Sequence, residues 1–212
     1  MLITSSDSEA KEILDNPKGV FSHYFLYLNT VSKLASGTLG KDINLNKELP
    51  EAITKAKNLI IVGNKKTVTE KLIQFIDSAV FVVKNYSVSK KYKILLPVND
   101  SKGSEKAIDT AINFAKSYKL TVEIVAVYEN RKSHEKTDKL LLRTKNKFLK
   151  NKINASTKIL EGSTVNAIVD HAKDDSIIIL GVSPKNPIMK YFFGSKPISI
   201  AQKCNCPVLI TK

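Results

Sequence analysis

Two segments of the sequence carry side chains and backbone groups that could bind an anion. Pro97-Val98-Asn99-Asp100-Ser101 follows an apolar stretch and offers an amide and a hydroxyl. Residues 181–195 begin with Gly181 and end with Gly194-Ser195, directly before Lys196 and a proline typical of a first helical turn. Backbone N–H groups at a helix start favour bound anions, and Lys196 adds positive charge. An ordinary glycine turn with a serine cap explains the same residues, so both interpretations stay open.

The stretches around these segments alternate between strand and helix patterns. Short apolar runs rich in Val and Ile are typical of buried parallel strands, whereas apolar residues three and four apart are typical of amphipathic helices. The pattern predicts strands at 93–98, 120–128, 157–160, 177–181 and 207–211, and helices that begin at Ser104, Ser133, Ser163 and about Pro197. We therefore expect an α/β fold with a doubly wound, parallel five-stranded sheet, in which ligands bind beyond the carboxyl ends of the strands.

The first part of the chain repeats this organisation in a reduced form. Leu59-Ile60-Ile61-Val62-Gly63 matches Ile177-Ile178-Ile179-Leu180-Gly181, and each run is followed by a helix-like stretch and a second apolar run. The first copy lacks the long loop that follows the glycine in the second copy. We expect two tandem copies, a reduced domain at residues 1–85 and a complete domain at residues 86–212.

Three motifs of the complete domain belong together. Pro97-Val98-Asn99 ends the first strand, Gly181-x2-Pro184-x9-Gly194-Ser195 follows the fourth, and Cys206-Pro207-Val208 opens the last. Together they resemble the universal stress protein family, whose motifs are Pro-x-Asp, Gly-x2-Gly-x9-Gly-Ser/Thr and Cys-Pro-Val. The resemblance implies the adenine nucleotide alpha hydrolase-like fold of that family, in a tandem protein whose first repeat is degenerate.

The resemblance also implies which residues would form a nucleotide site for ATP or another adenine nucleotide, with Mg²⁺ or Mn²⁺. Asn99, reached through Pro97 and Val98, stands where a carboxylate helps to hold the nucleoside. Val127 matches a position that lines the adenine pocket through its backbone, and Gly181 lies by the ribose. The phosphate end would be formed by Pro184, Gly194, Ser195 and Lys196.

Two departures from the family pattern affect this site. Asn99 replaces an aspartate and exchanges a charged acceptor for a neutral amide. Pro184 replaces a glycine and has no N–H to donate to a phosphate. A missing hydrogen bond to a charged group costs about 1.5–3 kcal/mol. The family contains members that bind nucleotides and members that do not, and the sequence alone leaves both open.

The reduced domain is expected to have a structural role. Nothing after Gly63 is long enough to wrap a triphosphate. Because family dimers pair through their final strands, the resemblance implies an intramolecular pseudo-dimer through strands 79–83 and 207–211. An exposed strand edge invites aggregation, which gives such pairing a physical motive. A homodimer and an unknown protein partner remain open.

Composition argues against several other classes of function. The net charge is +14, but only Arg131 and Arg143 are arginines, and the lysines are spread along the chain, which argues against a dedicated nucleic-acid binder. No apolar run approaches the ~20 residues of a membrane span, and the start does not resemble a signal peptide, so we expect a cytoplasmic protein. Cys204 and Cys206 are expected on opposite faces of a strand, as reduced thiols. The three histidines have no metal-binding spacing.

These observations favour one function and leave two alternatives. The first is a non-enzymatic regulatory protein of the stress response that binds an adenine nucleotide in the complete domain. No general base is evident, so we predict no catalytic residue and at most weak ATP hydrolysis. The second is a nucleotide-free scaffold or partner-binding protein, and the third is charge-driven binding of nucleic acid. The basic stretch 131–152 is either a solvated helix face or a docking surface for an acidic partner.

Overall fold

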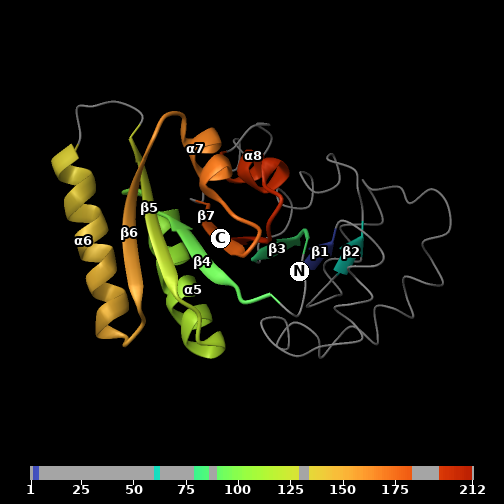
Figure 1. The fold of residues 1–212 in the computed structure, drawn as a ribbon, viewed down its shortest axis with the longest axis horizontal. Helices are drawn as coiled ribbons and strands as arrows, with labels where there is room; N and C mark the ends of the chain where they lie inside the picture. The colour runs from blue at the N-terminus through green and yellow to red at the C-terminus, as the bar shows by residue number, and fades with distance from the viewer. Residues whose placement is uncertain are drawn as a thin grey trace.

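The computed structural model describes residues 2–4, 60–62, 79–85, 90–128, 134–182 and 196–211, and the fold is described for these residues (Figure 1). In chain order the elements are β1 (Leu2–Thr4), β2 (Ile60–Val62), β3 (Val80–Val83), β4 (Lys93–Pro97), α5 (Lys102–Tyr118), β5 (Val122–Tyr128), α6 (His134–Lys150), β6 (Ala155–Glu161), α7 (Thr164–His171), β7 (Ser176–Gly181), α8 (Lys196–Lys203) and β8 (Val208–Thr211).

The described strands form one sheet in the order β2-β1-β3-β8-β7-β4-β5-β6. From β8 to β6 all neighbouring strands are parallel, which confirms the predicted parallel five-stranded sheet. β4 lies between β7 and β5, so successive strands are added first on one side of β4 and then on the other. This reversal is the topological switch point at which doubly wound sheets bind their ligands.

Helices cover both faces of the five-stranded part. α5 and α6 contribute Phe114 and Phe148 to a buried cluster on one face. α7 and α8 contribute Ile168 and Ile198 to a second cluster on the other face. Continuous apolar strands such as β7, buried at every residue except the last, fit between these two layers. The two-layer cover confirms the doubly wound α/β architecture.

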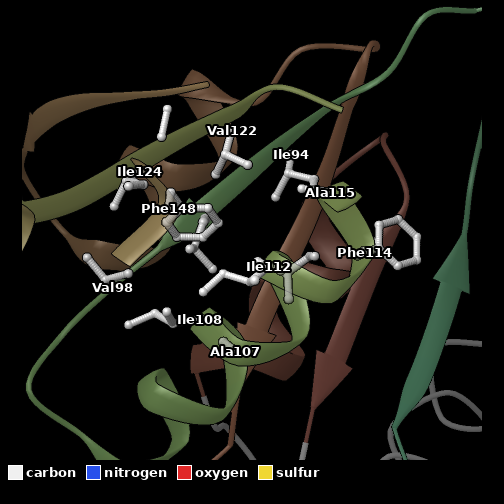
Figure 2. Packing of buried hydrophobic residues seen from close by; sticks show 14 of the residues in the cluster. Ile94, Val98, Ala107, Ile108, Ile112, Phe114, Ala115, Val122, Ile124 and Phe148 are labelled. Atoms are coloured by element: carbon white, nitrogen blue, oxygen red, sulfur yellow. The ribbon is translucent and has the colours of Figure 1, made fainter. Parts of the chain in front are cut away.

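α5 shows why the sequence folds in this way. Its buried side chains recur three and four residues apart and face the strands, as Figure 2 shows for Ala107, Ile108, Ile112, Phe114 and Ala115. Burial of one isoleucine contributes about 2 kcal/mol. The helix ends at Tyr118, and its C-cap is Lys119, whose φ of 53° lies in the left-handed region and whose N–H donates to the carbonyl of Ala115.

Some predicted boundaries are wrong. α5 begins at Lys102 and its N-cap is Ser101, whereas Ser104 was expected to be the cap. The reason is that the Ser101 hydroxyl accepts the Ser104 N–H at 3.2 Å, while Ser104 itself is buried inside the first turn. β5 begins two residues later than expected, at Val122, and β6 is longer than expected. The sequence of the first copy also predicts a short helix at 8–14 and a strand at 20–28, and both lie outside the described residues.

Three short strands represent the first part of the chain. β1 pairs in parallel with β2 and with β3, and β3 pairs antiparallel with β8, with Phe81 opposite Leu209. In this order β2 lies at the edge of the sheet, whereas its sequence counterpart β7 lies between β4 and β8. These strands alone do not define a second domain. The reduced domain at 1–85 therefore stays a prediction.

The segment after β3 is hydrogen-bonded to the end of α8. The Lys84 ammonium donates to the carbonyls of Ala201, Gln202 and Cys204 at 2.8, 2.8 and 3.1 Å. These carbonyls are at or just beyond the C-terminal end of the helix, where intrahelical donors run out and a positive charge is favoured. A side chain far away in sequence thus caps α8.

The two cysteines follow α8 directly. Both are free and buried, and both belong to the cluster on the α7–α8 face. The expectation that they point to opposite faces of a strand is wrong, because Cys204 and Cys206 lie in the turn before β8. A hydrogen bond from Cys206 lowers the pKa of the Cys204 thiol, and the same bond together with burial raises the pKa of Cys206. The thiols are therefore part of the core.

Candidate functional site

The switch point brings two of the predicted segments to the same edge of the sheet. β4 pairs directly with β7, with Leu95 opposite Ile178. The strands run in parallel, so Pro97 at the end of β4 and Gly181 at the end of β7 both lie at the carboxyl edge. Val98, directly after β4, is buried and bonds the carbonyl of Val125 through its N–H.

Asn99 lies in a short capped turn between β4 and α5. Its Oδ1 accepts the N–H of Ser101 at 3.2 Å, and its own N–H donates to the Ser104 hydroxyl at 3.1 Å. The Ser101 N–H can only donate, so this bond fixes which end of the amide is oxygen. The side chain is exposed, and its Nδ2 makes no hydrogen bond to another described residue. Asn99 therefore presents a donor at the carboxyl edge.

Gly181 is in close contact with the first turn of α5. A Cβ at this position would lie 1.7 Å from the carbonyl oxygen and 2.2 Å from the carbonyl carbon of Gly103. No side chain fits there unless α5 moves away from β7. The packing of helix against strand is thus a sufficient reason for glycine at 181, with or without a ligand.

Val127 and Tyr128 form the carboxyl end of β5. Val127 pairs with Leu160 of β6 and is half-buried against the α7–α8 face. Tyr128 is buried, and its hydroxyl donates to Asp138 of α6 at 3.4 Å. Burial and the neighbouring Asp138 carboxylate raise the pKa of Tyr128 above its ordinary value of 10.0. The hydroxyl is thus held in its neutral form.

Lys196 is the first residue of α8 and is exposed. Its ammonium donates to the hydroxyl of Thr164, the first residue of α7, at 3.0 Å. The starts of the two helices on this face therefore lie together, and α7 begins just beyond the carboxyl end of β6. This places Lys196 at the carboxyl edge as well.

Three predicted site residues, Pro184, Gly194 and Ser195, lie outside the described residues. The structure thus brings Pro97, Val98, Asn99, Val127, Gly181 and Lys196 to the carboxyl edge and leaves the loop between Val182 and Lys196 undescribed.

Sequence reasoning named Ser101 and Ser104 but missed how they support Asn99, and it missed Gly103 next to Gly181. Ser101 and Ser104 hold the turn, and Gly103 makes room for β7. The signal was present, because a serine followed by a second hydroxyl three residues later resembles a capping box, and a glycine in a first helical turn often has a packing reason.

A second charged cluster lies at the opposite edge of the sheet. His171 Nε2 is 3.1 Å from one carboxylate oxygen of Glu123, and the Lys93 ammonium is 3.7 Å from the other. Lys93 begins β4 and Glu123 is the second residue of β5, so the cluster lies towards the amino ends of the strands. It does not contribute to the switch-point site.

The described residues hold no set of three or more His, Cys, Asp and Glu side chains arranged to bind a metal ion. None of the helices in this part of the chain combines the length and the apolar character needed to cross a bilayer.

Comparison with known proteins identifies the family. Residues 92–212 match the sequence profile of the universal stress protein family. This match covers more than half of the chain, and the protein therefore belongs to the universal stress protein family. No curated protein matches the chain significantly.

Solved structures share the fold. A structure reported as a universal stress protein from Pseudomonas aeruginosa is similar over 100% of this chain and 91% of its own, with 16% identity and a TM-score of 0.60. A universal stress protein from Archaeoglobus fulgidus DSM 4304 covers 88% of this chain and 78% of its own, with 17% identity and a TM-score of 0.57. Another from Archaeoglobus fulgidus covers 57% and 98%, with 21% identity and a TM-score of 0.50. Identities this low establish the fold alone.

Proposed function

We propose that the protein is a regulatory protein of the stress response whose complete domain binds ATP or another adenine nucleotide at the switch point. The observation that carries this proposal is the position of Asn99. It is exposed at the carboxyl edge next to the reversal of strand order, its Nδ2 makes no hydrogen bond to another described residue, and a turn holds its backbone. By resemblance to the family motif, the nucleoside would contact this residue.

The nucleoside would contact Asn99 through Nδ2, because Oδ1 already accepts the Ser101 N–H while Nδ2 makes no hydrogen bond to another described residue. A donor at this place suits an acceptor atom of the ribose or the base. The aspartate of the family motif offers a second acceptor oxygen instead, which suits a ribose hydroxyl. Asparagine therefore weakens the contact without removing it.

The phosphates would lie at the start of α8. Gly194 and Ser195 precede the helix directly, and Lys196 supplies a positive charge. Backbone N–H groups at this end of a helix favour an anion, and bound Mg²⁺ or Mn²⁺ would neutralise part of the phosphate charge. Pro184 offers no N–H, so we expect a weak site.

The test is a calorimetric titration of the full chain with ATP, with and without Mg²⁺ or Mn²⁺. Saturable binding is expected, and Ser195→Ala and Gly194→Val should abolish or greatly weaken it. Ser163→Ala is the matched control, because Ser163 is the N-cap of α7 but makes no side-chain capping bond. If no heat is detected up to millimolar ATP, or if the loop variants bind as well as the unchanged protein, the proposal fails.

A nucleotide-free, partner-binding role is the second candidate. Gly181 is compatible with it, because contact with Gly103 explains that glycine with or without a ligand. Pro184 favours it, because the proline removes a phosphate donor of the family loop. A negative titration combined with intact folding would support this role.

A further inference from the structure

α6 forms the outer side of the molecule next to β6, far from β3 (Figure 1). Its inner side packs on the sheet through Leu140, Leu141 and Phe148, all of which are buried. This inner side accounts for the attachment of the helix. The main contacts of α6 with other described elements are with β5 and β6.

The outer side carries two exposed leucines. Leu142 and Leu149 are 60% and 50% exposed, and they are the exposed large apolar side chains of the described residues. They are seven residues apart, so they lie in one line about two turns apart along the helix. Asn146 lies between them, four residues after Leu142, and is also exposed. Leucines at this spacing with an intervening asparagine are typical of a helix that pairs with another helix.

Positive charge flanks the leucine line. Arg143 and Lys150 each follow a leucine by one position and therefore lie on the same side of it, whereas Lys145 lies on the other side. Among the described residues these three cations form no ion pair, whereas Lys139 is paired with Glu135 at 2.6 Å. A shallow hollow lies beside Leu142, on the side of Arg143 and Lys150, and is lined by Lys139, Leu142, Arg143, Asn146, Lys147 and Lys150.

This combination selects one kind of occupant. A second copy of α6 would bring Arg143, Lys145 and Lys150 towards the same cations, which is unfavourable. A nucleic acid would use the cations but leave the leucines in water, and one arginine is few for phosphate recognition. A helix lying in a membrane interface needs a wide apolar face, whereas this side offers one line of two leucines.

We propose that the outer side of α6 is a docking surface for an acidic amphipathic helix of another protein. The partner places leucine-like side chains between Leu142 and Leu149 and carboxylates opposite Arg143, Lys145 and Lys150. The interaction uses none of the residues of the switch-point site. It therefore remains possible in a protein with or without bound nucleotide.

The experiment uses the full chain and a fluorescently labelled synthetic helical peptide, with leucines seven residues apart and glutamates beside them. Binding is followed by fluorescence anisotropy at rising salt concentration. Two comparison peptides are used, one with scrambled order and one with lysines in place of the glutamates. We expect the glutamate peptide to bind saturably and the two comparison peptides not to bind. Rising salt concentration should weaken the binding of the glutamate peptide.

Two double variants test the apolar and the charged parts separately. Leu142→Ser with Leu149→Ser, and Arg143→Glu with Lys150→Glu, should each weaken binding roughly tenfold or more. The matched control is Lys106→Glu with Lys158→Glu, which changes the net charge equally at two exposed lysines outside α6 and should leave binding unchanged. The charge-reversed α6 should gain affinity for the lysine peptide. All substituted positions are exposed, so circular dichroism should show an unchanged fold.

The proposal is overturned if the glutamate peptide does not bind, if the scrambled peptide binds equally well, or if the control variant weakens binding as much as the α6 variants. Vesicles of anionic phospholipid are titrated in parallel. Vesicle binding that depends on Leu142 and Leu149, without peptide binding, would assign the surface to membranes and would also overturn the proposal.

Discussion

Gly181 illustrates how one residue joins packing to the site. Replacing it with alanine would place a methyl group 1.7 Å from the Gly103 carbonyl oxygen, and backbone atoms cannot yield as a flexible side chain can. We expect Gly181→Ala to lower the free energy of unfolding by about 3 kcal/mol. Urea unfolding followed by circular dichroism measures this change. Gly162→Ala is the comparison, because its Cβ meets nothing within 4 Å and only its φ of 110° opposes the substitution. Equal losses in both variants would contradict the packing role.

Asn99 has a prediction of its own. Asn99→Asp keeps an acceptor for the Ser101 N–H and adds a second oxygen for a ribose hydroxyl, so ATP should bind more tightly. Asn99→Ala removes the donor and should weaken binding roughly tenfold or more. Calorimetric titration of both variants checks the order Asp, Asn, Ala. Tighter binding by the alanine variant would show that the nucleotide does not contact this residue.

The environment of Tyr128 predicts that the stability of the protein depends on pH in the alkaline range. Burial and Asp138 raise its pKa above 10.0, so the folded state favours the neutral hydroxyl more than the unfolded state does. The contribution of this raised pKa to the free energy of unfolding is fully present below about pH 10, and it is lost as the pH rises through the pKa of the folded state. Stability measured between pH 9 and pH 12 should therefore fall less in Tyr128→Phe. The ultraviolet absorbance titration of the seven tyrosines should lose a late-ionising member in that variant. In Asp138→Asn that member should ionise earlier, and an unchanged titration in both variants would contradict the assignment.

The C-terminal end of α8 is capped by a residue that lies far away in the sequence. Lys84 follows β3 and donates to three carbonyls at the end of α8. We expect Lys84→Met to destabilise the protein by about 1–2 kcal/mol, because the apolar stem is kept and the charged donor is lost. Chemical unfolding measures the difference. Lys106→Met, at an exposed position of α5, should have no measurable effect. A loss of the same size there would contradict the capping role.

The elements differ in how well their sequences predict them. β4, β7 and the inner side of α5 were predictable. A continuous apolar run is typical of a buried strand, and apolar residues three and four apart are typical of one buried helix side. The start of α5 was not, because Ser101 and Ser104 are both good caps and only the hydrogen bond between them decides. The turn at Cys204 and Cys206 was also misjudged, because the pattern of alternation applies to strands and these residues precede one.

For the whole molecule, the pairing of β3 with β8 has a testable consequence. β3 covers the edge of β8 that the five-stranded sheet would otherwise expose. A fragment of residues 86–212 should therefore associate through Val208–Thr211, because an open strand edge pairs with another copy. Light scattering after size-exclusion chromatography measures the mass. The full chain, run at the same concentration, is the reference. A fragment that stays monomeric would show that the edge does not need its cover.

The predictability of the site follows from topology. The switch point could be derived from the order of strands and helices, since parallel strands all end at one edge, and this placed Asn99 with Gly181. The contact of Gly181 with Gly103 could not be derived, because it depends on how closely α5 approaches β7. The partners of Lys84 were equally hidden, because a single lysine more than a hundred residues away carries no local signal.

The most direct test of the central claim is a nuclear magnetic resonance titration of the ¹⁵N-labelled full chain with ATP and Mg²⁺. The account predicts that the shifted amides cluster at the carboxyl edge, at Val98–Ser104, Gly181 and Lys196, while those of α6 stay in place. Shifts confined to the basic outer side of α6 would show a non-specific anion contact. That result, or no shifts at millimolar ATP, would contradict a nucleotide site at the switch point.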